Sequence, residues 1–81
     1  MDMKRAIDPD QKELFVKIGQ KIKQLRKATG LSYIETANNI KLSKNSYYMI
    51  ENGQVALQIS SLKRILIYHG LTLTEFFSDI D

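Results

Sequence analysis

The chain has 81 residues, of which 43% are hydrophobic and 26% are charged, and its formal net charge is +3. A chain of this length forms one domain with a small core, and because it has no cysteine it has neither a disulfide framework nor a thiolate metal site. No apolar run approaches the roughly 20 residues that cross a bilayer, and no hydrophobic segment of a signal peptide follows Lys4 and Arg5. We therefore expect a cytoplasmic protein without membrane contact.

The charge is divided unevenly along the chain. Residues 12–44 contain eight basic and two acidic residues, a balance of +6, whereas the remainder contains four basic and seven acidic residues, a balance of −3. A concentrated basic segment is the electrostatic footprint of a protein that binds a phosphate backbone. The alternative is a solvated helix face, because lysines are common on exposed helix surfaces.

The first predicted helix begins after Asp8, a suitable cap, at Pro9, whose missing N–H suits the first helical position. Gly30 ends this helix in the left-handed conformation that glycine adopts without strain. Apolar residues recur every three or four positions between these ends, which indicates one buried face. That stripe consists of Leu14, Ile18, Ile22 and Leu25, with Phe15 and Ala28 beside it.

The next two predicted helices are short and meet at a tight corner. Ser32 and Glu35 form a capping box that begins the first of them, and Ser43 caps the second. Residues 41–42 form the corner, and residues 52–53, Asn-Gly, tolerate the left-handed backbone that ends the second helix. This layout is typical of a helix-turn-helix, whose second helix can enter the major groove of DNA.

Two more helices complete the predicted fold. The fourth begins near Ile59 or Ser60 and ends at Gly70, and a capping box of Thr72 and Glu75 begins a short fifth helix. The sequence shows no alternating strand pattern, so we expect an all-α, compact five-helix bundle. The inward positions after the first helix are Ala37, Ile40, Tyr47, Ile50, Leu62, Ile65 and Leu66, with His69 at the edge.

These segments resemble the phage repressor and Cro type of helix-turn-helix domain. The resemblance implies a lambda-repressor-like fold, binding to a DNA operator and frequent dimerisation. The chain departs from the family pattern at Tyr33, where glutamine is usual, at Thr36, where an apolar residue is usual, and at Lys41, where glycine is frequent. The resemblance extends from about Ile18 to Phe77 and is carried by Ile18-Gly19, Leu25-Arg26-Lys27, Gly30-Leu31-Ser32, Ala37, Ile40, Leu42-Ser43, Ile50-Glu51-Asn52-Gly53, Gly70-Leu71 and Leu73-Thr74-Glu75-Phe76-Phe77.

The outer face of the helix at residues 43–51 is the predicted base-reading surface. It carries Lys44, Asn45, Tyr48 and Met49. Lysine can donate to guanine O6 and N7, and asparagine can pair with adenine N6 and N7. Tyr48 and Met49 can pack against thymine methyls or against sugar. The alternative interpretation of these two residues is a minor packing patch or an interface with another protein.

Five polar residues are predicted to contact phosphates. They are Ser32, Tyr33, Ser43, Ser46 and Asn52, placed at helix starts or just beyond a helix end. Free N–H groups and the helix dipole favour a phosphate at a helix start, and the resemblance puts Tyr33, Ser46 and Asn52 at phosphate-contacting positions. For Ser32 and Ser43 the alternative is helix capping alone, and the two roles can coexist.

The resemblance also suggests an ion pair between Arg26 and Glu51 that sets the angle of the recognition helix. The alternative is two unrelated surface charges.

Large apolar residues gather near the C-terminal end and suggest a homodimer. Part of this set must complete the core, and the rest is the predicted two-fold interface. The set is Leu71, Leu73, Phe76, Phe77 and Ile80.

We expect no enzyme, no metal and no cofactor, because His69 is the only histidine and no glycine-rich phosphate loop is present. One small domain leaves no room for a sensor of small molecules, so no small-molecule effector is expected. The predicted parts are an arm at residues 1–8, either disordered or touching DNA, the helix-turn-helix domain at 9–78 and a tail at 79–81.

The sequence thus predicts a sequence-specific regulator of transcription, a repressor that binds double-stranded DNA at a palindromic operator. The alternative is a protein-interaction module of the same fold, an antitoxin or anti-repressor subunit. The weakly basic loop after Gly53 favours that alternative.

Overall fold

The computed structural model describes residues 8–80, which form one 3-10 turn, five α-helices and no strand. The expected all-α fold is therefore confirmed. Most of the predicted arm, residues 1–7, and the last residue of the predicted tail lie outside the described residues. The elements are η1 (Pro9–Gln11), α1 (Lys12–Thr29), α2 (Tyr33–Ile40), α3 (Lys44–Glu51), α4 (Ile59–His69) and α5 (Leu73–Phe77).

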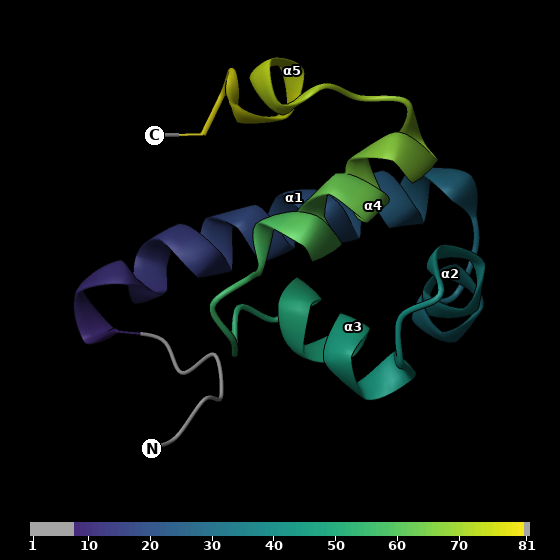
Figure 1. The fold of residues 1–81 in the computed structure, drawn as a ribbon, viewed down its shortest axis with the longest axis horizontal. Coiled ribbons are helices and arrows are strands. Elements are labelled where there is room, and N and C mark those ends of the chain that lie inside the picture. The colour runs from purple at the N-terminus through teal and green to yellow at the C-terminus, as the bar shows by residue number, and fades with distance from the viewer. Residues whose placement is uncertain (1–7, 81) are drawn as a thin grey trace.

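The long helix α1 is the support on which the others are arranged (Figure 1). In this view α2 and α3 lie below α1, and α5 lies above it. Helix α3 packs against both α1 and α2, and α4 contacts α2 and α5. None of the helices in the described part of the chain is long and apolar enough to cross a membrane.

The helix caps form as the sequence predicts. The Ser32 hydroxyl accepts a hydrogen bond from the N–H of Glu35, whose carboxylate accepts from the N–H of Ser32. The same reciprocal arrangement joins Thr72 and Glu75 at the start of α5. Each box satisfies two N–H groups that have no partner within the helix, so both starts are fixed locally.

The core draws on every α-helix. The stripe along α1 is less buried at its ends than we expected: Leu14 is 37% exposed and Ala28 is exposed. Leu14 lies in the first turn of α1, and the N-terminal end of this helix extends beyond the other helices in Figure 1. The buried hydrophobic residues are Ile18, Ile22, Ala37, Ile40, Tyr47, Ile50, Leu62, Ile65, Leu66 and Phe76.

A glycine lets α1 approach the end of α3. A Cβ atom on Gly19 would lie 2.4 Å from the carbonyl oxygen of Ile50 and 2.6 Å from that of Glu51. Both obstacles are backbone atoms, which cannot rotate away as a side chain can. The backbone of α1 therefore touches the backbone of α3 directly, and this contact limits where α3 can lie.

The C-terminal segment is fastened to α1 by one lysine. The ammonium of Lys21 donates to the carbonyl oxygen of Phe76 over 2.7 Å and also pairs with the carboxylate of Asp79. Ile80 packs against the buried cluster. Asp79 and Ile80, which we assigned to the tail, thus contact the packed domain.

Candidate nucleic-acid interface

The outer face of α3 presents the four side chains predicted to read bases. Lys44, Asn45, Tyr48 and Met49 are all exposed, Tyr48 by 46% and Met49 by 37%. Tyr47 points the other way and is wholly buried. Positions i, i+1, i+4 and i+5 share one side of an α-helix, so the four side chains form one continuous surface.

The corner before α3 is fixed by backbone contacts. Lys41 adopts the left-handed conformation with a φ of 68°, the one non-glycine residue with positive φ among residues 8–80. The N–H of Leu42 donates to the carbonyl of Ala37 over 3.0 Å, and Arg64 Nη1 donates to the carbonyl of Lys41 over 3.1 Å. A non-glycine residue in this conformation costs about 1 kcal/mol, which these contacts offset.

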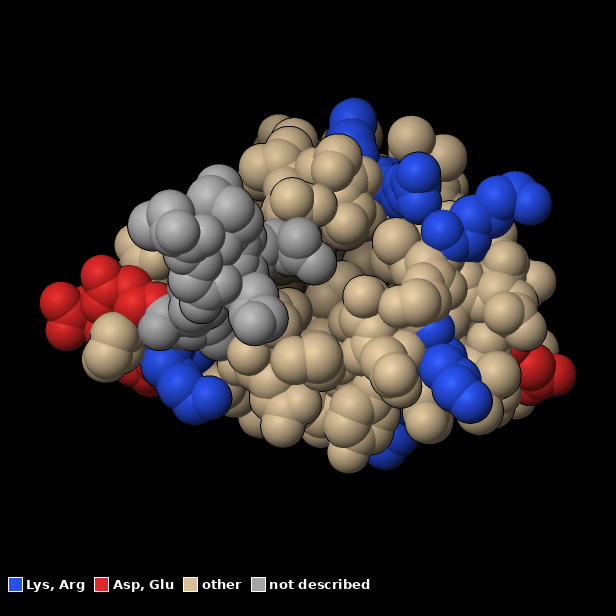
Figure 2. All heavy atoms as spheres, turned by 60° about the horizontal axis from the view of Figure 1, so that its bottom comes forward, with Lys and Arg blue, Asp and Glu red and all other residues tan. Residues whose placement is uncertain are grey.

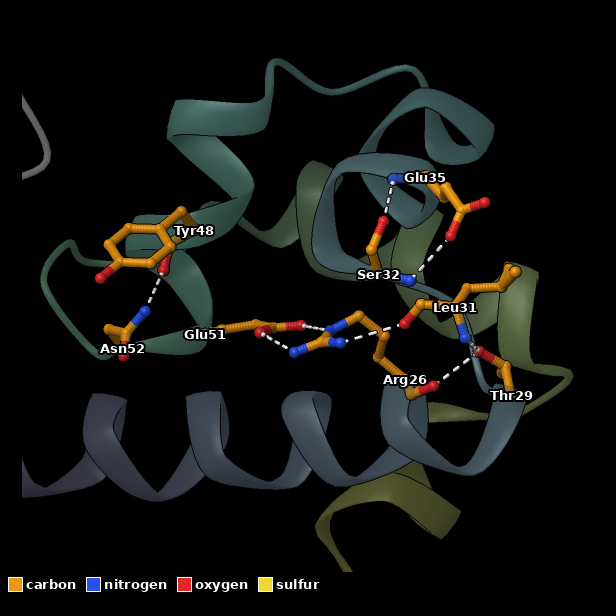
Figure 3. A network of polar contacts seen from close by, with 8 residues as sticks. All are labelled: Arg26, Thr29, Leu31, Ser32, Glu35, Tyr48, Glu51 and Asn52. Atoms are coloured by element: carbon orange, nitrogen blue, oxygen red, sulfur yellow. Dashed lines mark hydrogen bonds and ion pairs between the residues drawn. The ribbon is translucent and has the colours of Figure 1, made fainter.

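The predicted ion pair between Arg26 and Glu51 is present beneath α3 (Figure 3). Arg26 Nε lies 2.7 Å from Glu51 Oε2, and Nη2 lies 3.1 Å from Oε1. The remaining guanidinium nitrogen, Nη1, donates to the carbonyl of Leu31 over 3.0 Å. One side chain therefore joins α1, the segment that leads into α2, and the end of α3. The hydrogen bond to Glu51 raises the pKa of Arg26 above its usual value.

Two of the three serines predicted to contact phosphates, Ser32 and Ser43, act as helix caps, whereas Ser46 lies within α3. Ser32 Oγ accepts from the N–H of Glu35, and Ser43 Oγ accepts from the N–H of Ser46, each over 3.1 Å. A hydroxyl that accepts a bond can still donate its own proton, so capping leaves a donor for a phosphate oxygen at both helix starts. The hydrogen bonds from Ser32 lower the pKa of Glu35, which keeps its carboxylate charged.

Asn52 closes α3 from the other end. Its side-chain Nδ2 donates to the carbonyl of Tyr48 over 2.8 Å, and its backbone N–H donates to the same oxygen over 3.1 Å (Figure 3). One of the two amide hydrogens is used in this way, which leaves the other for a ligand.

Two residues of the predicted site form a contact that the sequence did not reveal. The rings of Tyr33 and Tyr48 have centroids 5.3 Å apart and are inclined by 54°. Tyr33 is the first residue of α2, whereas Tyr48 lies in the second turn of α3. No helical periodicity relates two residues on different helices, so the only signal was that both are aromatic.

The basic segment is more neutralised than its charge balance suggests. Lys17 pairs with Glu13, Lys21 with Asp79 and Arg26 with Glu51. Lys41 and Lys44 are exposed at the corner before α3. Glu13 is already counted in the balance of +6, but Asp79 and Glu51 lie outside residues 12–44. The electrostatic footprint on a phosphate backbone is therefore smaller than the sequence indicates.

Figure 2 shows the face of the molecule that lies at the bottom of Figure 1, where α2 and α3 are. Lys and Arg side chains are spread over this face, and the acidic side chains of the described residues show only at its two ends. A polyanion approaching the middle of this face meets positive and neutral groups, which lowers the cost of bringing phosphates close.

The predicted dimer set is divided between core and surface. Phe76 is wholly buried and belongs to the core cluster, so it is a member of the set that completes the core and is not available to an interface. Leu73 is 37% exposed, and the other three, Leu71, Phe77 and Ile80, are half-buried. Among residues 8–80 the most exposed large hydrophobic side chains are instead Ile59 and Ile67 on α4, at 67% and 70%. Ile67 lies on the side of α4 opposite Leu62 and Ile65, and this spacing was visible in the sequence. Ile59 shares the side of Leu62 but is the first residue of α4.

Within residues 8–80, no cluster of three histidine or acidic side chains is arranged to hold a metal ion.

The helix-turn-helix family profile matches residues 22–76, more than half of the chain. Control protein C.MunI from Mycoplasma sp. is 39% identical over 70 residues, which are 85% of this chain and 95% of that protein. The cryptic phage CTXphi transcriptional repressor RstR of Vibrio cholerae is 30% identical over 59 residues, 73% of this chain and 53% of RstR.

A solved structure shares the fold. The crystal structure of the restriction-modification controller protein C.AhdI from Aeromonas hydrophila superposes with a TM-score of 0.76 and 26% sequence identity. The match covers 84% of this chain and 99% of C.AhdI. The chain therefore belongs to the phage repressor and Cro-type helix-turn-helix family and is a DNA-binding regulator of transcription.

Proposed function

We propose that the protein represses the genes of a restriction-modification system by binding a palindromic operator as a homodimer. The repressor role is supported by RstR, and the kind of target gene by the restriction-modification controller protein C.AhdI. This chain spans 95% of the control protein C.MunI and 99% of C.AhdI, so the likeness is not limited to a shared domain within larger chains. Such a regulator acts in the cytoplasm, where bacterial and phage operators lie.

The observation that carries the proposal is the outer face of α3. An α-helix fits the major groove, which displays a different pattern of donors, acceptors and methyl groups for each base pair. Exposed Lys44 and Asn45 lie in the first turn of α3, the part of a recognition helix that reaches base edges. Lysine suits guanine, and asparagine suits adenine.

Contacts to the DNA backbone supply most of the proposed affinity. The start of α2 offers unpaired N–H groups beside Ser32 and Tyr33, and the start of α3 offers the hydroxyls of Ser43 and Ser46. Asn52 adds an amide hydrogen beyond the end of α3. These contacts orient the protein and carry no sequence information, and they weaken as salt rises.

The homodimer places two copies of α3 in successive major grooves. Half-sites about 34 Å apart, one turn of the duplex, suit a two-fold dimer. The interface that we propose is the C-terminal apolar group without Phe76: Leu71, Leu73, Phe77 and Ile80. Sedimentation that gives only the monomer at high concentration, with and without DNA, rules this assembly out.

A selection of bound sequences from random duplex DNA tests the proposed function. We expect a palindromic consensus, and we expect Asn45→Ala to lose about 1–3 kcal/mol of binding and to relax the preference at one position per half-site. Asn38→Ala, which removes the same amide from the exposed surface of α2, is the matched control and should retain the preference. Failure to bind any duplex at low salt contradicts the proposal and favours a protein-interaction module.

The target genes need a separate test. We expect the selected consensus to lie in front of restriction or methyltransferase genes in the organism that encodes this chain, and a reporter gene behind that sequence to be silenced when the protein is present. Activation of the reporter contradicts repression, and a consensus located only near other genes contradicts the restriction-modification role.

A further inference from the structure

Tyr33 and Tyr48 form an aromatic pair that bridges α2 and α3 on the proposed DNA-binding face. Their centroid separation of 5.3 Å falls within the range of favourable aromatic pairs, and a tilted arrangement is preferred over a parallel sandwich. Tyr33 is half-buried and packs against the core cluster, whereas Tyr48 is 46% exposed. Tyr33 is thus the anchored member, and Tyr48 is the member that faces outward.

The backbone of Tyr48 is fixed near the end of α3. Its carbonyl oxygen accepts hydrogen bonds from both the backbone and the side chain of Asn52 (Figure 3). An exposed tyrosine on a helix samples several rotamers and loses that freedom when it binds a partner. A ring that its neighbour already fixes loses less rotamer freedom on binding. It also approaches its partner in a single orientation.

We infer that Tyr33 is a specificity-determining residue that acts through Tyr48. By holding the Tyr48 ring, it directs that ring onto the C5 methyl group of a thymine in the major groove. The inference rests on the proposed function, since it assigns the base that one position of the recognition surface selects. Tyr33 is a positioning residue here, because it sets the base preference without touching the base.

A thymine methyl is the group that this part of α3 suits best. In the major groove the methyl is the apolar feature that separates an A·T pair from a G·C pair. Tyr48 lies beside Met49, which is itself 37% exposed, so the second turn of α3 presents a mainly apolar surface. The donors of α3, Lys44 and Asn45, lie one turn earlier and face other base pairs.

The position of Tyr33 places its ring at the edge of the proposed interface. It is the first residue of α2, next to the N–H groups that favour a phosphate. A DNA backbone seated there brings the adjoining groove, and the bases within it, against Tyr48. Glutamine, the usual residue at this position in the resembling family, can donate to the phosphate but cannot form the aromatic pair.

Thymine-to-deoxyuridine replacement tests the inference, because it removes only the C5 methyl. The duplex is the best-bound sequence from the selection described above, and each thymine is replaced in turn. We expect one position per half-site to lose affinity about 2- to 10-fold, the size of an aromatic or apolar contact. Tyr48→Ala should bind the replaced and unreplaced duplexes alike.

The Tyr33 variants separate positioning from phosphate contact. Tyr33→Phe keeps the ring and should keep the methyl dependence, whereas Tyr33→Gln should reduce it below about 2-fold. Tyr33→Leu, which retains apolar packing against the core, should behave as Tyr33→Gln does and serves if the glutamine variant does not fold. Thermal unfolding of each variant, followed by circular dichroism, verifies the folded state.

Three results overturn the inference. One is a Tyr33→Gln variant that weakens all duplexes equally and keeps the wild-type methyl dependence, since Tyr33 then contacts phosphate only. Another is a wild-type protein that is indifferent to every methyl of its selected duplex. The third is a wild-type protein that does not distinguish the selected duplex from a scrambled one, which overturns the proposed function as well.

Discussion

The guanidinium of Arg26 and the carboxylate of Glu51 meet at two points, Nε to Oε2 at 2.7 Å and Nη2 to Oε1 at 3.1 Å. The side chain of Glu51 is only 2% exposed and that of Arg26 is 13% exposed. Two parallel hydrogen bonds between planar groups define an orientation as well as a distance. The pair therefore fixes the end of α3 relative to α1.

Removing the arginine alone should destabilise the protein strongly. Arg26→Met leaves the Glu51 carboxylate buried without a partner, and we expect the free energy of unfolding to fall by about 3–5 kcal/mol. The double variant Arg26→Met, Glu51→Leu should recover much of that loss, because no charge is then stranded. Urea denaturation of the two single variants and the double variant measures the coupling.

An exposed ion pair is the control for that cycle. Lys17→Met breaks the pair with Glu13, where the nitrogen and oxygen are 3.6 Å apart and the glutamate side chain is 83% exposed. We expect a change below about 1 kcal/mol. Strictly additive effects of Arg26→Met and Glu51→Leu would show that the two residues contribute independently to stability.

Gly19→Ala should disturb the contact between α1 and α3. The added methyl would lie 2.4 Å from a backbone oxygen, so the helices must separate, and we expect a loss of about 1–3 kcal/mol in the free energy of unfolding. DNA affinity should also fall under conditions where the variant is fully folded, since α3 is displaced. Gln20→Ala, on the adjacent exposed position, is the control; equal stability of the two variants contradicts the close contact.

Thr36→Val should stabilise the protein. Thr36 is wholly buried, and its hydroxyl oxygen has no hydrogen-bond partner. Replacing an unsatisfied hydroxyl by a methyl of similar size removes a desolvation cost of about 1–3 kcal/mol, so we expect the midpoint of thermal unfolding to rise. Thr72→Val is the contrasting variant, because that hydroxyl caps α5; its midpoint should fall. A lowered midpoint for Thr36→Val would mean that its hydroxyl stabilises the folded chain.

His69 should make stability depend on pH as the pH falls below its ordinary pKa of 6.5. Burial lowers the pKa of His69 below its ordinary value of 6.5, so the unfolded chain binds a proton more readily than the folded one. The neutral His69 side chain contributes fully to stability above its pKa in the unfolded chain. This contribution is lost as the pH falls from 6.5 toward its pKa in the folded protein.

The measurement is urea denaturation of wild type and His69→Gln at several pH values. We expect the wild-type free energy of unfolding to fall as the pH drops below 6.5 and that of His69→Gln to change less. The lowered pKa values of Glu35 and Asp79 act in a more acidic window, below their ordinary values of 4.5 and 3.8. Parallel pH profiles for the two proteins would show that His69 is not responsible.

Local signals in the sequence predicted the helices and their ends. Capping boxes, Gly30 and the apolar stripes each act over a few residues, and each appears in the fold as expected except at Leu14 and Ala28, the exposed ends of the α1 stripe. The pairing of Arg26 with Glu51, 25 residues apart, came from the family resemblance, because no local pattern relates the two.

Contacts between distant elements account for what the sequence did not predict. The pairing of Lys21 with Asp79 spans 58 residues, and the contact of Tyr33 with Tyr48 depends on the angle between two helices. The burial of Phe76 follows from the way α5 closes over the core. Such features depend on tertiary packing, which composition and periodicity do not contain.

None of the outward side chains of α3, Lys44, Asn45, Tyr48 and Met49, belongs to the buried cluster. Substitutions at these four positions consequently carry little penalty for folding. During evolution such regulators can change the operator that they bind by altering a few codons. The fold that positions the four side chains is inherited unchanged. Related proteins in one cell can in this way come to govern separate genes without evolving a new fold.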